Sequence, residues 1–290
     1  MSTVDEWVRQ ARRAHIEEMA QLPRPRLARV RDLTVAGLPA RLYMPSTNGR
    51  LPVLVYFHGG GWVLGDIDSY DPVARALALA GSAAVLSIEY RRPPEDPFPA
   101  AVDDAEAAVR WTFANASVLG LDPDRIGVTG DSAGGQICVA TALRLAASPD
   151  GPEPALQLLI YPALDLRAAP PTQAGASPGD GATRRLLERM FTLYLGEANR
   201  SHPEASPLLA PDLTRLPTTV MVTAEHDLLR PQGEEFAHLL REAGVVTTIF
   251  TGHGLAHGFL GREPSAELPT SLTSRFGRQV TTELSQKDAC

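Results

Sequence analysis

The sequence contains little cysteine and no long apolar run. Its two cysteines, Cys138 and Cys290, are too few for a disulfide framework and lack the spacing of a metal site. The first ten residues are polar and charged, without the apolar core of a secretory signal. No later run reaches the roughly 18 apolar residues needed to cross a bilayer. We therefore expect a cytoplasmic protein with reduced thiols and no stable insertion into a membrane.

Positive charge is outnumbered by negative charge. The chain has 27 Lys and Arg residues against 34 Asp and Glu residues, a formal net charge of −7. This balance gives no electrostatic reason to expect nucleic acid or an anionic membrane surface as a partner. The 290 residues show no internal repeat and no linker between domains. One domain over residues 1–290 is therefore expected.

The hydrophobic pattern alternates between strands and helices. Thr3–Ala20 has the period of an amphipathic helix, and Val30–Val35 and Ala40–Met44 alternate like an antiparallel pair of strands. Later buried strands are expected over Val53–Phe57, Ala83–Ile88, Arg125–Thr129, Leu156–Tyr161, Thr219–Ala224 and Val245–Phe250. The helices expected between and after them cover Val73–Ala80, Ala100–Asn115, Gln136–Ala147, Arg184–Leu195, Gln232–Ala243 and Pro264–Leu284. This alternation predicts an α/β fold, with a mostly parallel sheet covered by helices on both faces.

Two stretches fit this pattern less well. Asp165–Ala182 is rich in Pro, Gly, Ala and Ser, which is typical of a loop. Asp165–Pro207 as a whole is too short to bury a core of its own, so we interpret it as an insertion above the sheet. Gly277 weakens the helix expected at the end of the chain.

Ser132 lies in the sequence Gly130-Asp131-Ser132-Ala133-Gly134, between an expected strand and an expected helix. This is the G-x-S-x-G nucleophile elbow, a strained turn that lifts the serine hydroxyl out of the backbone. Glycines flank it because side chains would collide where strand and helix close on each other. The amide of Ala133 opens the helix and points toward the same space, where the helix end favours an anion.

A serine nucleophile needs a base and an acid that orients the base. Asp227 and His257 follow Ser132 in the order Ser, Asp, His and stand just after expected strands, at the edge where parallel sheets bind ligands. Glu225 is an alternative acid, and His253 is an alternative base. His253 and His257 also have the spacing of two ligands on a metal-binding helix. The glycines around them make a helix there unfavourable, so no metal is expected.

His58-Gly59-Gly60-Gly61 follows an expected buried strand. Attack on an ester carbonyl places negative charge on its oxygen, and glycines allow backbone amides to approach that oxygen closely. We assign the amides of Gly60, Gly61 and Ala133 as the donors, whereas Gly59 makes the turn. His58 is expected to brace the loop through hydrogen bonds rather than to transfer protons.

These motifs together resemble the hormone-sensitive-lipase-like branch of the α/β hydrolases, the bacterial family IV esterases. The resemblance covers about residues 52–260 and consists of His58-Gly59-Gly60-Gly61-Trp62, Glu89-Tyr90-Arg91, Phe98-Pro99-Ala100-Ala101, Asp122-Pro123-Asp124-Arg125-Ile126, Gly130-Asp131-Ser132-Ala133-Gly134-Gly135, Ser206-Pro207-Leu208, Asp227-Leu228-Leu229-Arg230 and His257-Gly258-Phe259. Asp131 resembles the GDSAGG subgroup. Gln136 stands where this family commonly has Asn.

The resemblance implies an eight-stranded α/β-hydrolase fold with a helical cap, formed here by about residues 1–28 and about 165–207. It also implies hydrolysis of carboxylic esters with short to medium acyl chains, without a cofactor. The same residues would also suit amide, carbamate, lactone or aryl ester substrates. A ligand-binding receptor that has lost catalysis is a further alternative, although such receptors replace the base and His257 is present here.

The last expected strand, Val245–Phe250, would lie at an edge of the sheet. An unpaired strand edge favours pairing with a second copy across a two-fold axis. We therefore expect a homodimer formed through residues 245–250.

Overall fold

A computed structural model describes residues 3–170, 180–262 and 272–285 of the chain. Eight strands within these residues form one sheet: β1 (Arg29–Val35), β2 (Leu38–Met44), β3 (Leu51–Phe57), β4 (Ala84–Ile88), β5 (Leu121–Asp131), β6 (Leu156–Ile160), β7 (Thr218–His226) and β8 (Thr247–Ala256). Their spatial order is β1-β2-β4-β3-β5-β6-β7-β8. β2 is antiparallel to both of its neighbours, and all other neighbouring strands are parallel. The predicted α/β-hydrolase fold with a mostly parallel eight-stranded sheet is confirmed.

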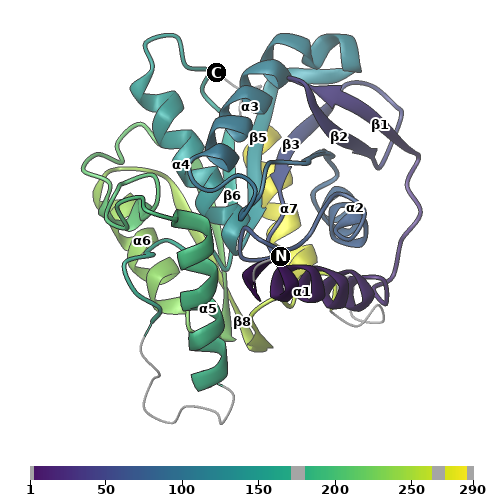
Figure 1. Cartoon of the computed structure of the whole chain (residues 1–290). Helices are drawn as coiled ribbons and strands as arrows, with labels where there is room; N and C mark the ends of the chain where they lie inside the picture. The colour runs from purple at the N-terminus through teal and green to yellow at the C-terminus, as the bar shows by residue number, and fades with distance from the viewer. Residues whose placement is uncertain (1–2, 171–179, 263–271, 286–290) are drawn as a thin grey trace.

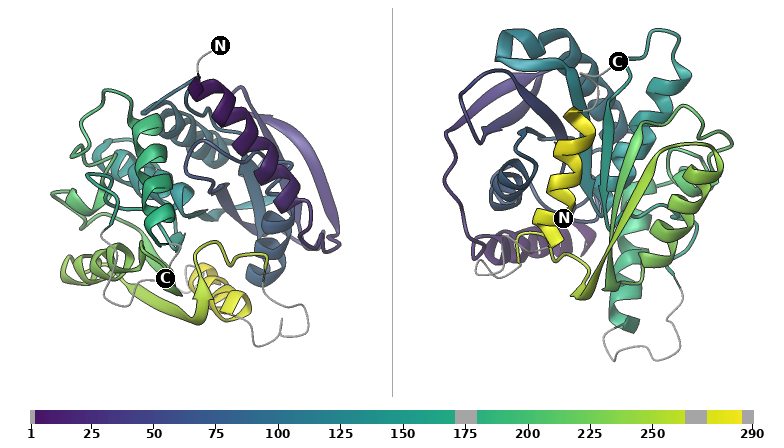
Figure 2. Two further views of the ribbon diagram at one scale, coloured as in Figure 1. Left: turned by 60° about the horizontal axis from the view of Figure 1, so that its bottom comes forward. Right: turned by 180° about the vertical axis from the view of Figure 1, so that it is seen from behind.

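Helices cover both faces of this sheet (Figures 1 and 2). The described helices are α1 (Thr3–Met19), α2 (Asp71–Gly81), α3 (Ala100–Leu119), α4 (Ala133–Ala147), α5 (Asp180–Leu195), α6 (Arg230–Glu242) and α7 (Leu272–Ser285), with a short 3-10 turn η1 (Pro207–Leu209). Apolar side chains of α3, α4 and α6 pack on one face, and those of α2 and α7 pack on the other. β3 shows that the parallel strands are covered on both faces. Val55 and Phe57 of β3 join the first of these cores, whereas Leu54 and Tyr56 join the second. A strand buried on both faces reads as a continuous apolar run, which is why β3 shows no alternation.

The helices α1 and α5 lie apart from these two layers, on the lower side of the molecule in Figure 1. Side chains of both helices line a cavity that also contains Ser132, at the carboxyl ends of the parallel strands. This placement agrees with the edge at which open α/β sheets bind ligands.

The prediction for β8 was wrong at its far end. The strand was expected to end at Phe250, but it continues to Ala256. The ladder between β7 and β8 shifts register between Ala224 and His226, and Gly254 takes a positive φ of 73° there. The Gly254 amide donates to the carboxylate of Glu225 at 2.7 Å, so a side chain replaces the missing ladder bond. The glycine therefore accommodates a bulge instead of ending the strand.

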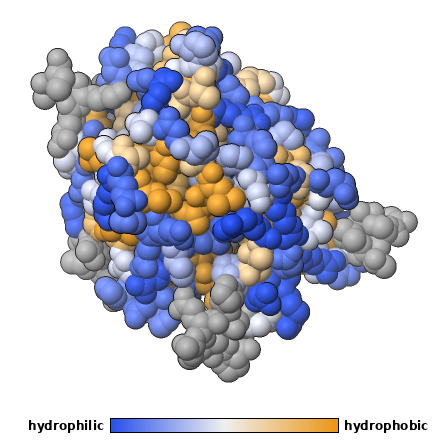
Figure 3. All heavy atoms as spheres, turned by 90° about the vertical axis from the view of Figure 1, so that its left-hand side faces the viewer, coloured by the Kyte–Doolittle hydropathy of each residue, from blue (hydrophilic) through white to orange (hydrophobic). Residues whose placement is uncertain are grey.

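Polar side chains cover most of the face on the left of Figure 1, with one apolar area near its centre (Figure 3). None of the helices within the described ranges is both long and apolar enough to span a bilayer.

The loop expected over Asp165–Ala182 and the helix expected over Pro264–Leu284 fall partly outside the described residues. Residues 171–179 and 263–271 are the parts not described.

Gly277, which weakened the helix prediction, lies inside α7 where that helix packs on α2. A Cβ atom added to Gly277 would lie 2.4 Å from the backbone oxygen of Ala80. No relaxed structure brings a Cβ so close to a carbonyl oxygen. The glycine is therefore required by the close approach of two helices, although it is unfavourable for the helix alone.

We predict that Gly277→Ala destabilises the protein. Alanine improves helix propensity by about 1 kcal/mol, but separating α7 from α2 costs about 1–3 kcal/mol. Urea unfolding followed by circular dichroism measures the difference. Gly181→Ala in α5 is the matched control, because its Cβ would meet nothing nearer than the Arg185 side chain at 3.6 Å. A more stable Gly277→Ala variant would contradict this packing argument.

Candidate active site

Ser132 occupies a sharp turn between the end of β5 and the start of α4. Its φ of 54° lies in the left-handed region, which costs a residue other than glycine about 1–3 kcal/mol. The turn is held by three backbone hydrogen bonds, from Ser132 N to Ile160 O at 2.9 Å and from the amides of Ala163 and Gly135 to Ser132 O, both at 3.1 Å. This strained strand-to-helix turn is the geometry expected of a nucleophile elbow.

The two glycines beside Ser132 are needed for steric reasons. A Cβ on Gly130 would lie 2.3 Å from the carbonyl of Gly134. A Cβ on Gly134 would lie 1.9 Å from the carbonyl oxygen of Phe57, at the end of β3. The nucleophile turn therefore lies in direct backbone contact with the start of the loop that follows β3.

The structure brings the three predicted polar residues into one row. His257 Nε2 lies 2.9 Å from Ser132 Oγ, and His257 Nδ1 lies 2.7 Å from Asp227 Oδ2. Asp227 directly follows β7, and its side chain is 3% exposed. Its other carboxylate oxygen, Oδ1, accepts a hydrogen bond from the Leu229 amide at 2.8 Å. His257 directly follows β8. One ring nitrogen can thus hold the proton shared with Asp227 while the other accepts the proton of Ser132.

The alternative acid and base lie elsewhere, beside each other. Glu225 belongs to β7 and His253 to β8, and the His253 ring lies 3.5 Å from the Glu225 carboxylate. The His253 side chain is 83% exposed. Neither residue lines the cavity that contains Ser132. In the described part of the chain, no cluster of three His, Cys, Asp or Glu side chains is arranged to hold a metal ion.

The environment of His257 alters its basicity. Burial lowers the pKa of His257, but the charge and hydrogen bond of Asp227 outweigh it, with a further contribution from the charge of Asp131. The resulting pKa lies above the ordinary histidine value. A base with a raised pKa binds the serine proton more strongly once the imidazole is neutral.

The loop after β3 presents backbone amides beside Ser132. Gly60 and Gly61 have φ angles of 96° and 60°, which turn the peptide units away from the regular strand path. Within the described residues, the amides of Gly60, Gly61 and Ala133 have no protein acceptor. Both glycines and Ser132 line the same cavity. Unpaired amides at a cavity wall can bind an oxyanion.

Asp131 anchors this loop, a role that the sequence analysis missed. Asp131 Oδ1 accepts the amide of Gly59 at 2.9 Å and the hydroxyl of Tyr56 at 2.7 Å. Burial raises the pKa of Asp131 to about 6, although both hydrogen bonds oppose the shift. The position of Asp131 next to Ser132 was the available signal, but its partners come from β3 and from the loop that follows it.

His58 is fully buried at the base of the same loop. Its ring lies between Tyr70 and Tyr90, with centroid distances of 4.8 and 4.5 Å, and its Nδ1 is 2.8 Å from the carbonyl oxygen of Gly59. Burial lowers the pKa of His58 to about 3, so the ring is neutral near pH 7. These contacts hold the loop, and none of them joins His58 to Ser132.

The cavity in front of Ser132 has a volume of about 330 Å³. Its floor consists of Ser132, Asp131, His257 and the two glycines, and one wall is Tyr161, whose ring centroid lies 4.8 Å from that of His257. Tyr161 was also missed, because nothing in the sequence marks it apart from its place after a strand. To the other walls α1 contributes His15, Glu18 and Met19, and α5 contributes Thr183, Leu186, Leu187 and Met190. The rest of the lining consists of Leu64, Tyr70, Val73, Gly258, Leu260 and Arg262.

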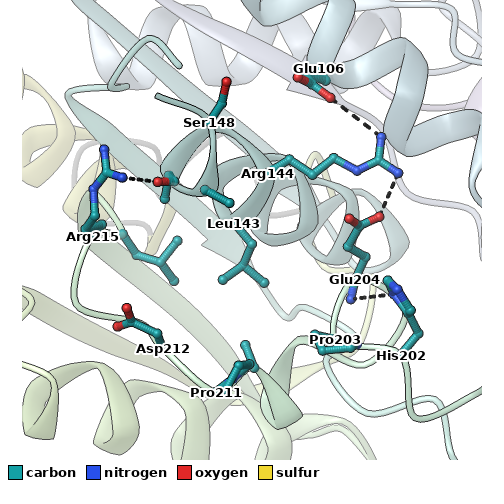
Figure 4. Close-up of a pocket in the computed structure, with 14 residues that line it drawn as sticks. Glu106, Leu143, Arg144, Ser148, His202, Pro203, Glu204, Pro211, Asp212 and Arg215 are labelled. Carbon is teal, nitrogen blue, oxygen red and sulfur yellow. Dashed lines mark hydrogen bonds and ion pairs between the residues drawn. The ribbon is translucent and has the colours of Figure 1, made fainter. Parts of the chain in front are cut away.

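A larger cavity of about 600 Å³ lies beside the far end of α4 (Figure 4). None of the predicted site residues lines it. Its most buried cation, Arg144, is already paired with Glu204 at 2.7 Å and with Glu106 at 3.7 Å. The smaller cavity is therefore the one that joins a nucleophile, a base and free amides.

A family model described as the alpha/beta hydrolase fold matches residues 54–261. The chain belongs to the α/β-hydrolase family. The match begins in β3 and ends beyond His257, so it includes all the loops that form the small cavity floor.

Several relatives of the chain are named as ester hydrolases. The chain is 39% identical to the carboxylic ester hydrolase LipN of Mycobacterium tuberculosis over 262 residues, covering 86% of this chain and 70% of that protein. It is 35% identical to an arylesterase of Saccharolobus solfataricus, covering 90% and 83% of the two chains. A hyperthermophilic esterase from the archaeon Pyrobaculum calidifontis superimposes with a TM-score of 0.85 at 36% identity, covering 95% and 93%. The hormone-sensitive-lipase-like branch is thus the family to which this hydrolase belongs.

We predict that Asp227→Asn lowers the pKa of His257 relative to its value in the wild type. The substitution removes the negative charge that favours the protonated ring, whereas the effect of burial, which disfavours it, remains. NMR titration of the imidazole C–H signals measures the change. Glu225→Gln is the control and leaves the titration of His257 unchanged, because Glu225 contacts Gly254 and His253 instead. An unaltered His257 pKa in Asp227→Asn would contradict the assigned pair.

Proposed function

We propose that this α/β hydrolase is a serine carboxylesterase in which Ser132 is the nucleophile, His257 the general base and Asp227 the acid that orients the base. The observation that supports this most is the continuous row of hydrogen bonds from Asp227 through His257 to Ser132. Hydrolysis of carboxylic esters is also the activity named for the similar proteins.

In the first step, Ser132 Oγ attacks the ester carbonyl carbon while His257 Nε2 takes the hydroxyl proton. Asp227 keeps the proton on Nδ1 and stabilises the imidazolium that forms. The carbonyl oxygen becomes an oxyanion in front of the amides of Gly60, Gly61 and Ala133. Each such donor is worth about 3–4 kcal/mol in the transition state. His257 then gives its proton to the departing alcohol, and an acyl-enzyme remains on Ser132.

The second step repeats the sequence with water. His257 takes a proton from the water molecule as it attacks the acyl carbon, and the same three amides bind the second oxyanion. Collapse of this intermediate returns the proton to Ser132 Oγ and releases the carboxylic acid. Neither step requires a cofactor.

We further propose that about residues 1–28, which include α1, and about residues 165–207, which include α5, form a cap that selects the substrate. Side chains of α1 and α5 line part of the cavity, and four of them, Met19, Leu186, Leu187 and Met190, are apolar. A cavity of about 330 Å³ suits short to medium acyl chains.

Asp131 supports placement in the GDSAGG subgroup. Aryl esters, amides, carbamates and lactones are the alternative substrates. A receptor that lacks catalysis is disfavoured, because His257 is present and within reach of Ser132.

We predict that Ser132→Ala abolishes turnover of 4-nitrophenyl esters. Loss of the triad leaves only the binding and oxyanion contributions, so the rate falls by about 10⁶-fold. Initial rates on acetate, butyrate, hexanoate, octanoate and dodecanoate esters measure both the loss and the acyl preference, which we expect to peak at or below hexanoate.

His253→Gln is the control for this assay, since that exposed ring lies outside the cavity. It should keep wild-type rates across the series. Equal rates for Ser132→Ala and wild type would remove Ser132 from the mechanism. A preference for anilides or lactones over every ester would shift the proposed function to the corresponding alternative.

The proposed homodimer uses the outer edge of β8. β8 is the last strand in the sheet order, so it pairs with β7 alone within the described residues. The adjoining Val246 side chain is 62% exposed. Two such edges meeting across a two-fold axis would extend the sheet and cover these valines.

We predict that the wild type elutes as a dimer in size exclusion with light scattering, with twice the 31.1 kDa mass of one chain. Val246→Lys should weaken the dimer, because it places like charges at the pairing edge. Val118→Lys is the matched control, since this valine is 87% exposed at the end of α3, away from β8. A monomeric wild type at micromolar concentration would contradict the proposal.

A further inference from the structure

The loop that follows β3, residues 58–62, is called the oxyanion loop below. Its backbone is strained, and the strain needs support from neighbouring side chains. Gly60, Gly61 and Trp62 follow one another with φ angles of 96°, 60° and 64°. Glycine adopts such angles readily, but a bulky residue such as Trp62 does not. Strain of this kind persists only where the surroundings fix the residue in place. Contacts of the Trp62 side chain therefore help to decide how the neighbouring Gly61 amide points.

The Trp62 indole is held from two sides. Its ring stacks on Tyr194 of α5 at 4.5 Å with an interplanar angle of 8°, and Phe191 meets its edge at 5.8 Å. Stacking fixes the plane of the ring but leaves its position within that plane free. The indole Nε1 supplies the missing constraint, because it donates to Gln136 Oε1 at 2.7 Å.

Both polar atoms of the Gln136 side-chain amide make hydrogen bonds. It is fully buried in the first turns of α4, four residues after Ser132. Its Oε1 accepts the indole proton, and its Nε2 donates to the backbone carbonyl of Glu204. The Glu204 carboxylate is in turn paired with Arg144 on the same helix (Figure 4). The amide therefore cannot rotate without losing two buried hydrogen bonds.

We propose that Gln136 is a positioning residue for the reaction. Through Trp62, it holds the backbone of Gly60 and Gly61 so that their amides face the oxyanion beside Ser132. Gln136 and Ser132 belong to one rigid turn-and-helix unit, so this link sets the oxyanion loop relative to the nucleophile itself. The inference rests on the proposed function, because it gives Gln136 a role only if an oxyanion forms at this site.

The test is Gln136→Met, which keeps the length and shape of the side chain and removes both hydrogen bonds. Moving the amides away from the oxyanion should lower kcat for 4-nitrophenyl butyrate by about 10- to 100-fold. KM should stay within about threefold, because the cavity walls that bind the acyl chain are unchanged. Affinity for a trifluoromethyl ketone of the same chain length should fall in parallel with kcat, since its adduct with Ser132 places an oxyanion at the same amides.

Two further variants separate this role from general destabilisation. Thr141→Val removes another buried hydrogen bond from α4, one made only to Ile137 of the same helix. Its kcat should remain near wild type even if its melting temperature falls as far as that of Gln136→Met. Trp62→Phe should lower kcat as Gln136→Met does, and the double variant should lower it little further, because both changes break one link.

The outcomes are distinct. A kcat within about twofold of wild type for Gln136→Met, measured below its melting temperature, would overturn the inference. Fully additive effects of the two single changes would also overturn it. Ser132→Ala is measured in the same assay. If it is inactive while Gln136→Met is normal, only the positioning role fails, whereas an active Ser132→Ala removes the proposed function and this inference together.

Discussion

The site depends on the close backbone contact between the ends of two neighbouring parallel strands, β3 and β5. A Cβ on Gly134 would lie 1.9 Å from Phe57 O, and one on Gly59 would lie 2.4 Å from Asp131 Oδ2. Glycines at these positions allow the backbones of the nucleophile turn and of the loop after β3 to approach closely, with the Asp131 carboxylate held directly against Gly59. The distance from the serine hydroxyl to the free amides is thus set by the spacing of adjacent strands, which the sheet holds rigidly.

This arrangement stores unfavourable conformations and a buried charge at one point. Ser132 and Trp62 have left-handed backbones, and Asp131 is a carboxylate buried under the loop. Each is compensated locally, by backbone hydrogen bonds at Ser132, by Gln136 and Tyr194 at Trp62, and by Tyr56 and Gly59 at Asp131. The strain persists because the surrounding sheet and helices over-determine it. The proposed oxyanion donors are therefore preorganised, and in the proposed mechanism they need no rearrangement when charge develops.

The two helices outside the main layers are attached to this rigid centre by side chains. Arg12 of α1 donates to the carbonyl oxygen of Val63, next to the oxyanion loop, and pairs with Glu95. On α5, Met190 packs beside Gly61, and Arg189 lies over the Trp7 ring of α1 at 3.8 Å. The cavity walls from these helices are therefore joined to the loop after β3, so the proposed cap and the proposed oxyanion donors share one set of contacts.

Much of this could be predicted from the sequence because the signals are local. A continuous apolar run indicated that β3 is covered on both faces, and glycines on both sides of Ser132 indicated a turn too tight for side chains. The order Ser132, Asp227, His257 placed each of three polar residues shortly after an expected strand. Asp131, Tyr161 and the role of Gln136 could not be found in this way, because their partners are distant in the chain.

The choice between neighbouring candidates shows where local information ends. Glu225 and Asp227 are only two residues apart, but Glu225 belongs to β7 and Asp227 to the loop that follows it. His253 and His257 are separated by the bulge at Gly254. The sequence by itself determined which segments form strands, which turns require glycine, and in what order the chemical groups appear. Only the tertiary structure decided which acid meets which imidazole. The end of the β7–β8 ladder depends on cross-strand hydrogen bonds, and no single strand encodes them.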